Sequence, residues 1–425
     1  MRYQTFFKEA KKKNITNIQI AEVTKMNSQV SFINGQMEDY SDSTNVSYEI
    51  KAEYNGKTVK TNSNYLGVEI LDNLLLKINL TDTNYQNTYL ETRKNNSIKK
   101  KPNISIVDIM DRLKQLNSIK ENYREIKTLQ VSFSNQYEKR RIINSNGVDI
   151  ATDNNLYTFY TEAVADRNNS PVSYNCQMIE TLRKNINFEE IVEDTIEKAI
   201  LSLNKEKLDS KKYNIILSNS VAGEILSHLI DMISMINIRN NMSCLNNKLN
   251  QKVFSDKLTI VEDPLNKKYP GYSIFDNEGT YTNKKILVER GILKEYLYNN
   301  QEATLKNRKS TGNGYGTIDT RNMYIPIGNK NLVNLFSTMK DGLYITNFMG
   351  SSNTSIDTST GSISIQVFGF VLQDGKIQNS FEPAVLTTTI FELFNNLEEI
   401  GTDLEFVDTT AGSPSIYVKN ISIAA

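Results

Sequence analysis

The stretch "YNIILSNSVAGEILSHLIDMIS", residues 213–234, decides the fold, because a strand pattern and a helix pattern meet in it. The short apolar run at 213–218 indicates a buried strand, and Ser218, Asn219 or Ser220 can cap the helix that follows. A wide apolar stripe at helical spacing predicts that this helix, over 220–236, packs on a sheet. Its members are Ala222, Ile225, Leu226, Leu229, Ile230 and Ile233.

Strand and turn signals dominate the chain after this helix. "KKILVERGILKEYLY" (284–298) predicts one hairpin, and "SISIQVFGFVLQDGKIQ" (362–378) predicts another that turns at Asp374–Gly375. Tight hairpin turns favour antiparallel over parallel pairing, because parallel strands need long crossovers. We therefore expect residues 211–425 to form a mainly antiparallel β domain with an embedded helix.

The N-terminal half mixes helix and strand patterns. "NIQIAEV" (17–23) and "QVSFINGQ" (29–36) alternate apolar and polar residues, and Asn55–Gly56 predicts a hairpin turn. A Lys-rich segment near residue 100 separates a unit at 1–100 from a second α+β unit at 101–210, which has its own Asn146–Gly147 turn. The echo of "VSFINGQ" in "VSFSNQ" is compatible with a duplicated helix–strands–helix unit. The predicted fold class is α+β, with antiparallel sheets.

Composition excludes several classes of protein. Lys+Arg and Asp+Glu are both 49 of 425 residues, so the formal net charge is zero and nothing favours binding to nucleic acid. Two cysteines cannot make a disulfide framework or a four-thiolate zinc site. No signal peptide or run of about 20 apolar residues is found. We expect a soluble, cytoplasmic protein that does not act at a membrane.

Six motifs occur in an order that resembles the TldD/PmbA family. They are "FDNEG" (275–279), "ILVERGILKEYL" (286–297), "STGNGYG" (310–316), "DGLYI" (341–345), "TGSISIQVFGFVLQDGKI" (360–377) and "GSPSIYVKNISIAA" (412–425). This family was once described as modulators of DNA gyrase and is now regarded as peptidase-related. Each motif alone is a Gly-rich turn between strands, so the resemblance rests on their number and order.

The resemblance implies what this chain lacks. Active, TldD-type subunits carry a His-Glu-x-x-x-His motif on the corresponding helix and a cysteine near the C-terminus, which suit a zinc site with a Glu-activated water. Aligned through "VAGEIL", these motif positions hold Ser227, His228 and Met232, and "VDTTAGSP" (407–414) has no cysteine. The context of His228 resembles the metal-free TldE (PmbA) branch. We expect no catalytic residue and no metal in this chain, and zinc only in a TldD-like partner.

His228, the only histidine, is interpreted as a helix residue packed or hydrogen-bonded beside the apolar face. Among other candidates, Asp276 and Glu278 stand in a turn, where solvated side chains are expected rather than acid–base catalysis. Glu224 and Asp231 are further carboxylates without a motif. Cys244 has no histidine partner other than His228, which argues against a Cys–His nucleophile.

"STGNGYG" lacks the lysine and the strand–loop–helix context of a phosphate-binding loop, which favours a tight loop between strands. Our hypothesis for a peptide-facing loop is Ser310, Thr311 and Gly312.

Two function classes follow, and a third is disfavoured. The resemblance implies a non-catalytic TldE-like subunit that pairs with a zinc-dependent TldD-like peptidase and helps to process unfolded peptides, captured by strand addition. The alternative is a stand-alone, homodimeric peptide-binding or assembly protein without peptidase activity. An enzyme with a relocated, non-metal site would need catalytic motifs that the sequence lacks.

Overall fold

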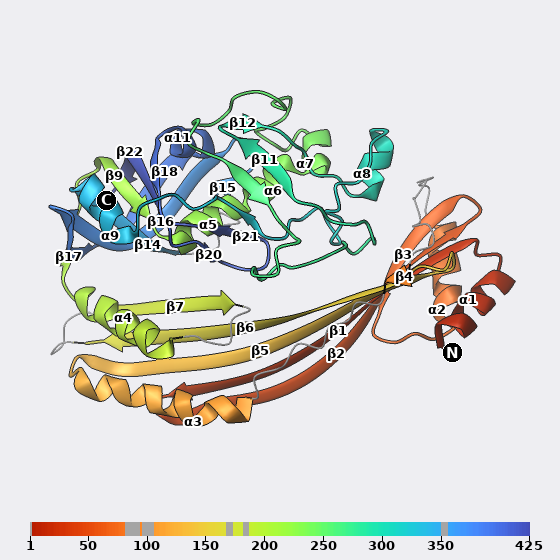
Figure 1. Ribbon diagram of the computed structural model, residues 1–425, viewed down its shortest axis with the longest axis horizontal. Helices are drawn as coiled ribbons and strands as arrows, with labels where there is room; N and C mark the ends of the chain where they lie inside the picture. The colour runs from red at the N-terminus through yellow and green to blue at the C-terminus, as the bar shows by residue number, and fades with distance from the viewer. Residues whose placement is uncertain (1, 81–93, 96–105, 167–172, 182–186, 350–355) are drawn as a thin grey trace.

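A computed structural model describes residues 2–80, 94–95, 106–166, 173–181, 187–349 and 356–425. Its N-terminal half is built on one long, curved sheet (Figure 1) in the order β3-β2-β1-β5-β6-β4, with β7 also paired to β6. The described pairs are antiparallel except β4 with β6. The strands are β1 (Asn17–Ile33), β2 (Gln36–Tyr54), β3 (Lys57–Ser63), β4 (Lys94–Asn95), β5 (Ile126–Asn144), β6 (Asp149–Ala165) and β7 (Ser173–Thr181).

The Asn–Gly dipeptides form hairpin turns in this sheet, as predicted. Asn55 and Gly56 have φ angles of 49° and 75°, the left-handed backbone that glycine and asparagine tolerate. They join β2 to β3, and Asn146–Gly147 lies between β5 and β6. The turns are local in sequence, which is why the pattern predicts them.

Two pairs of helices cover opposite ends of the long strands (Figure 1). Helices α1 (Arg2–Lys12) and α2 (Ile70–Asn79) share one apolar core with the sheet, and α3 (Ile106–Leu116) and α4 (Phe188–Leu201) share another. A 3-10 turn, Asn117–Asn122, follows α3. Strand β1 pairs with β5 along its length, so the ranges 1–100 and 101–210 share one sheet. The division into these two units stays a prediction.

The C-terminal half contains two further sheets. One has the order β12-β11-β10-β13-β21-β20. The other runs β14-β9-β22-β18-β16-β17-β8, and an extra pairing of β14 with β16 closes its first five strands into a ring. Most pairs are antiparallel, and the predicted hairpins at Arg290–Gly291 and Asp374–Gly375 are both present. The predicted α+β fold class and the mainly antiparallel C-terminal region are confirmed.

The strands of the first of these sheets are β10 (Ile260–Glu262), β11 (Lys285–Glu289), β12 (Ile292–Leu293), β13 (Met323–Tyr324), β20 (Glu405–Phe406) and β21 (Ala411–Ser413). Those of the second are β8 (Lys205–Glu206), β9 (Lys211–Leu217), β14 (Gly342–Met349), β15 (Ile356–Asp357), β16 (Ser362–Gln373), β17 (Lys376–Phe381), β18 (Ala384–Thr389), β19 (Leu397–Ile400) and β22 (Ile416–Ala424). Short helices lie between them: α8 (Asn300–Leu305), α9 (Leu332–Met339) and α11 (Ile390–Asn395).

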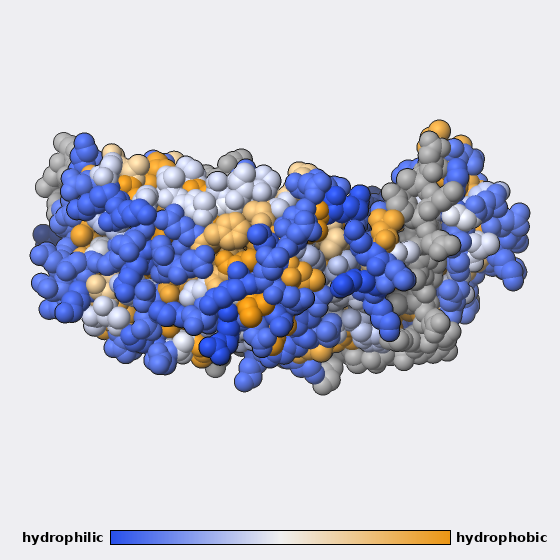
Figure 2. Space-filling view, turned by 90° about the horizontal axis from the view of Figure 1, so that it is seen from above, coloured by the Kyte–Doolittle hydropathy of each residue, from blue (hydrophilic) through white to orange (hydrophobic). Residues whose placement is uncertain are grey.

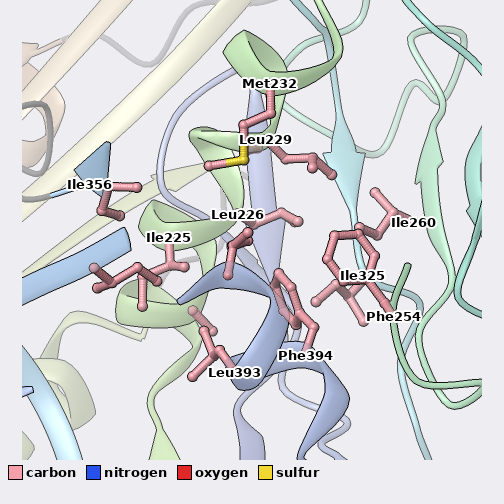
Figure 3. Packing of buried hydrophobic residues seen from close by; sticks show 14 of the residues in the cluster. Ile225, Leu226, Leu229, Met232, Phe254, Ile260, Ile325, Ile356, Leu393 and Phe394 are labelled. Carbon is pink, nitrogen blue, oxygen red and sulfur yellow. The ribbon is translucent and has the colours of Figure 1, made fainter. Parts of the chain in front are cut away.

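The segment predicted as one helix over 220–236 forms three short helices, α5 (Asn219–Ser227), α6 (Leu229–Ile233) and α7 (Met235–Arg239). The Ser218 side chain caps α5 by accepting a hydrogen bond from Val221 N. The helix breaks before α7 because the backbone there bonds to Leu297: Leu297 N donates to Ile233 O and Met235 N donates to Leu297 O. The predicted apolar stripe is buried in the C-terminal core (Figure 3).

The long strands run beneath the C-terminal half (Figure 1), and polar contacts join the two. Gln19 Nε2 donates to Glu278 O at 3.1 Å, and Asn154 Nδ2 donates to Pro270 O at 2.6 Å. Figure 2 shows that the face seen from above is mostly hydrophilic, with apolar side chains gathered near its middle. No helix of the described ranges combines the length and the apolar character that crossing a membrane requires.

Candidate functional site

The three positions of the expected metal motif have different surroundings. Ser227 Oγ donates a hydrogen bond to Glu224 O at 2.7 Å. Met232 is fully buried, and its thioether lies among the apolar side chains of the core (Figure 3). His228 is 5% exposed, and among the described residues its Nε2 has no hydrogen-bond partner. These positions thus provide one imidazole nitrogen, a thioether within the core and a hydroxyl bonded to its own helix.

This donor set does not fit a zinc ion. A serine hydroxyl is rarely a zinc ligand and a thioether is a poor one, whereas structural and catalytic zinc sites use His, Cys and carboxylate ligands. Within the described part of the chain, no group of three or more His, Cys, Asp or Glu side chains is arranged to hold a metal ion. Burial lowers the pKa of His228, against the opposing charges of Glu224 and Asp231, and this favours a neutral imidazole.

Asp276 and Glu278 have structural roles, and the expectation that they are solvated is wrong. Both are buried. Asp276 Oδ1 accepts hydrogen bonds from the backbone N–H groups of Glu278 and Thr280, and its Oδ2 accepts one from Gly314 N at 2.8 Å. Glu278 Oε2 accepts one from Asn300 N at 2.7 Å, where α8 begins. The carboxylates fasten the 275–279 turn to the 310–316 loop and to α8.

The environment of Asp276 makes the ionised form costly. Burial, and secondly the charge of Glu278, raise the pKa of Asp276 to about 7, although three backbone N–H groups favour the charged form. A raised carboxyl pKa can mark acid–base catalysis. Both carboxyl oxygens of Asp276, however, already accept hydrogen bonds from backbone N–H groups of the fold. No local pattern predicts this burial, because the bonded partners lie up to 38 residues away in the chain.

The loop of Ser310, Thr311 and Gly312 is held against Tyr298. Both hydroxyls donate to Tyr298 O, at 3.0 and 3.1 Å, and Thr311 Oγ1 accepts from Tyr298 N. Gly312 has a φ of 77°, and a Cβ there would lie 2.8 Å from Tyr281 O. The loop lines neither of the two cavities described below, and its contact with peptide stays a prediction.

Cys244 is half-buried, and burial raises the pKa of its thiol to about 11. The thiol is therefore protonated at neutral pH, which makes it a poor nucleophile.

A cavity of about 600 Å³ lies where α4, the start of α5, β14 and β20 meet. Two edge strands of different sheets, β7 and β20, contact each other beside this cavity. Among the described residues, β20 pairs only with β21, and β7 pairs only with β6. Such edges present backbone groups to which an extended chain can bond. The lining residues are Asp194, Lys198, Ser218, Asn219, Ser220, Val221, Glu224, Leu332, Tyr344, Thr346, Asn347, Phe348, Asp403, Glu405, Phe406 and Val407.

A second cavity, of about 340 Å³, lies between β5, β6 and the 270–277 and 315–321 loops. Two guanidinium groups lie over the ring of Tyr315 inside it, that of Arg321 at 4.0 Å and that of Arg140 at 5.9 Å. Arg140 is also bonded to Glu138, and Arg321 to Asp319. The sequence pattern predicts neither cavity, because each cavity is lined by residues from segments more than 100 positions apart.

Family models match most of the chain. Residues 210–425 match the PmbA/TldA metallopeptidase C-terminal domain, and residues 99–203 match the central domain of the same family. The chain belongs to the PmbA/TldD family. The resemblance inferred from the six motifs is therefore confirmed.

Curated PmbA/TldD relatives include two proteins named metalloprotease PmbA homologs from strains of Buchnera aphidicola, both 28% identical. The first match covers 67% of this chain and 63% of the relative, and the second covers 69% and 65%. The chain thus matches slightly less than two thirds of each relative's length. A metalloprotease TldD homolog from the same species is 26% identical over 56% of this chain and 54% of the relative.

Solved PmbA/TldD structures share the fold. TldE from Thermococcus kodakarensis superposes with a TM-score of 0.89 at 19% identity and covers 100% of both chains. A protein from Thermotoga maritima, described as a modulator of DNA gyrase, superposes with a TM-score of 0.88 at 24% identity, over 100% of this chain and 99% of that one.

Proposed function

We propose that this chain is a non-catalytic, TldE-like subunit that binds unfolded peptides and pairs with a zinc-dependent TldD-like peptidase. The observation that carries the proposal is the donor set at the motif positions, Ser227, His228 and Met232. Their hydroxyl is bonded within the helix, their imidazole is buried and their thioether lies in the core. Loss of the metal ligands on a retained fold is expected of a subunit whose partner supplies the catalysis.

Peptide capture would use the neighbouring edges of β7 and β20 beside the larger cavity. An extended peptide that bonds through its backbone to a sheet edge is held largely independently of its sequence, which suits unfolded substrates. N-methylation of alternate peptide bonds removes N–H donors without changing the side chains. A methylated peptide should bind more weakly than its unmethylated counterpart, as measured by fluorescence anisotropy.

The pairing is tested by reconstitution with a TldD-like subunit that carries the His-Glu-x-x-x-His motif. We expect the isolated chain to cleave no unfolded casein, the mixture to cleave it, and a zinc chelator to stop the reaction. His228→Ala in this chain should leave the activity of the mixture intact. Cleavage by the isolated chain that survives chelation and disappears in His228→Ala would contradict the proposal.

The homodimeric alternative is decided by co-purification from the native cell, with the partner identified by mass. Recovery of a TldD-like chain in equal amount supports the heteromeric proposal, whereas recovery of a dimer of this chain alone favours the alternative. The cytoplasmic location belongs to the same proposal and is tested by cell fractionation.

A further inference from the structure

The first part of β2 forms an open edge of the long sheet. Strand β3 pairs with β2 only from Tyr48 to Tyr54, and among the described strands β2 has no neighbour other than β1 and β3. Residues 36–45, here called the β2 strip, are all exposed. Figure 1 shows β2 at the edge of the sheet opposite β7. Alternate backbone N–H and C=O groups of an edge strand point away from its neighbour, so the strip can bond to an added strand.

The β2 strip carries negative charge that no cation of the described chain compensates. It contains Glu38, Asp39 and Asp42, and it contains no lysine or arginine. None of the ion pairs between described residues includes these three carboxylates. Lys25, the one lysine of β1, pairs instead with Glu138 at 3.4 Å.

The hydrogen-bond partners of these carboxylates are neutral hydroxyl groups. Glu38 Oε2 accepts a hydrogen bond from Ser31 Oγ at 3.4 Å, and Asp42 accepts one from the Tyr40 hydroxyl. Hydrogen bonds from Ser28 and Tyr40 lower the pKa of Asp42, so this side chain is ionised at neutral pH. A hydroxyl donor stabilises a carboxylate without neutralising it, so the strip keeps its attraction for a cationic ligand.

Two large apolar side chains lie on the same strip. Met37 is 49% exposed and Tyr40 is 47% exposed. Their partners on β1, Phe32 and Val30, pack against α3, so both side chains point to the face of the sheet that α3 covers. Such exposed side chains provide contact area for the apolar stem of a lysine or arginine, whose charged end can reach the carboxylates.

We infer that the β2 strip binds an extended, lysine- or arginine-rich segment of an unfolded polypeptide, which adds to the sheet as a further strand. Backbone bonds would hold the segment, and its cationic side chains would give the specificity. A second copy of the chain is disfavoured, because pairing of two strips would bring three carboxylates from each copy together. A permanent subunit is disfavoured as well, since obligate interfaces are more apolar than this strip.

The inference rests on the binding of unfolded peptides proposed above, names the class of peptide, and uses a different edge from β7 and β20. The test compares labelled peptides in which threonine alternates with lysine, glutamine or glutamate. We expect the lysine peptide to bind about tenfold more tightly than the glutamine peptide, and the glutamate peptide to bind most weakly. N-methylation of alternate peptide bonds should weaken binding of the lysine peptide. The measurement is fluorescence anisotropy, and added salt should reduce the preference for lysine.

Amide hydrogen exchange locates the bound peptide. With the lysine peptide bound, exchange should slow in residues 36–45, because N–H groups that faced solvent donate to the added strand. Exchange that slows in β7 or β20 and not in the strip would overturn the inference. Exchange that slows in the strip without peptide, as the protein concentration rises, would show that a second copy is the occupant and would overturn it too.

A charge reversal assigns the preference to the strip. Asp39→Lys with Asp42→Lys should transfer the preference from the lysine peptide to the glutamate peptide. Asp256→Lys with Glu382→Lys is the matched control, because it makes the same change of net charge at two exposed acidic residues of the C-terminal half. The control should keep the preference for lysine.

A second variant decides the matter if the charge reversal prevents folding. Ser41→Lys with Ser43→Lys adds two cations at exposed, uncharged positions of the strip and keeps every carboxylate. It should reduce the preference for lysine by several-fold. An unchanged preference in this variant would overturn the inference.

Failure of the inference can be told apart from failure of the proposed function. Equal binding of all three peptides, unaffected by the strip variants, overturns the role of the β2 strip and leaves the proposed peptide binding intact. Binding of the lysine peptide alone, with slowed exchange in the strip, supports the inference and contradicts capture at β7 and β20. If no peptide binds, both the inference and the proposed peptide binding fail.

Discussion

At the scale of single residues, burial decides the chemistry of the polar groups. His228 is the only histidine in the chain, and the sequence placed it on a helix beside an apolar stripe. The structure adds that His228 is 5% exposed, that its Nε2 has no partner among the residues that the structure describes, and that burial lowers its pKa. A buried neutral histidine makes stability depend on pH, because as the pH falls the imidazole is protonated in the unfolded chain before it is protonated in the folded chain.

The first prediction concerns the pH dependence of stability that the lowered pKa of His228 causes. Above the ordinary histidine pKa of 6.5, both states are neutral at this position and His228 adds no pH dependence. As the pH falls below this value towards the lower pKa of the folded state, wild type should lose stability relative to His228→Gln. Urea unfolding of both proteins between about pH 7.5 and about pH 5 measures the difference. Glu224 and Asp231 face His228 in both proteins, so parallel stability curves would refute the prediction.

At the scale of elements, apolar periodicity defines the buried face of the helical segment, and tertiary contacts decide where the helix breaks. All six residues of the predicted stripe are buried across α5 and α6. The break before α7 depends on hydrogen bonds to Leu297, about 60 residues along the chain, which no local pattern announces.

The second prediction uses Leu229, which is fully buried in this stripe. Leu229→Ala should lower the free energy of unfolding by about 2–5 kcal/mol, because it leaves a cavity in the core. Leu305→Ala is the matched control: Leu305 ends α8 and is 52% exposed, so its replacement should change stability by less than about 0.5 kcal/mol. Equal effects in denaturant unfolding would show that the stripe is not packed as described.

The third prediction concerns the buried ion pair between β10 and β11. Glu262 is 0% exposed and pairs with Lys285 Nζ at 2.9 Å, while its Oε1 accepts hydrogen bonds from Asn313 and Arg321 N. Lys285→Met should cost about 3–5 kcal/mol at neutral pH, because an uncompensated carboxylate stays buried. Adding Glu262→Gln removes that charge, so the double variant should be more stable than Lys285→Met alone. A double variant that is less stable would contradict this.

At the scale of the whole molecule, the long N-terminal sheet is joined to the C-terminal half by polar contacts and by an apolar cluster in which Phe275 packs with Ala21 and Ile150. Gln19 is buried on β1, and its amide donates to the carbonyl of Glu278. Lys60 on β3 approaches Glu278 Oε1 at 3.8 Å. These contacts converge on the turn that also anchors the 310–316 loop.

The fourth prediction follows from this convergence. Gln19→Ala leaves a buried carbonyl without its donor and should destabilise the protein by about 1–3 kcal/mol. It should also speed amide hydrogen exchange in residues 275–280, because the turn loses its hydrogen bond to β1 and keeps only the packing of Phe275 there. Gln36→Ala, at an exposed position where β2 begins, is the control. Unchanged exchange at the turn would contradict the prediction and mean that the apolar packing of Phe275 is sufficient to hold the turn.

The sequence by itself determined the features that depend on neighbouring residues. Alternating polarity, Asn–Gly turns and the apolar stripe depend on local backbone preferences and on which face of an element is apolar, so the α+β class, the hairpins and the buried helical segment were predictable. The order of six motifs was sufficient to identify the family. The sequence alone also shows that the three motif positions hold Ser227, His228 and Met232.

Only the tertiary structure decided which distant segments meet. Closure of the sheet by β14 and β16, the burial of Asp276 and Glu278, and the cavity between α4 and β20 bring together groups far apart in the chain. Asp276 shows why: as a carboxylate in a turn it is solvated by default, until backbone N–H groups from its own turn and from Gly314 replace water. Local propensities determine which face of each helix or strand is apolar. The packing of all the elements together determines which charged side chains are buried away from water.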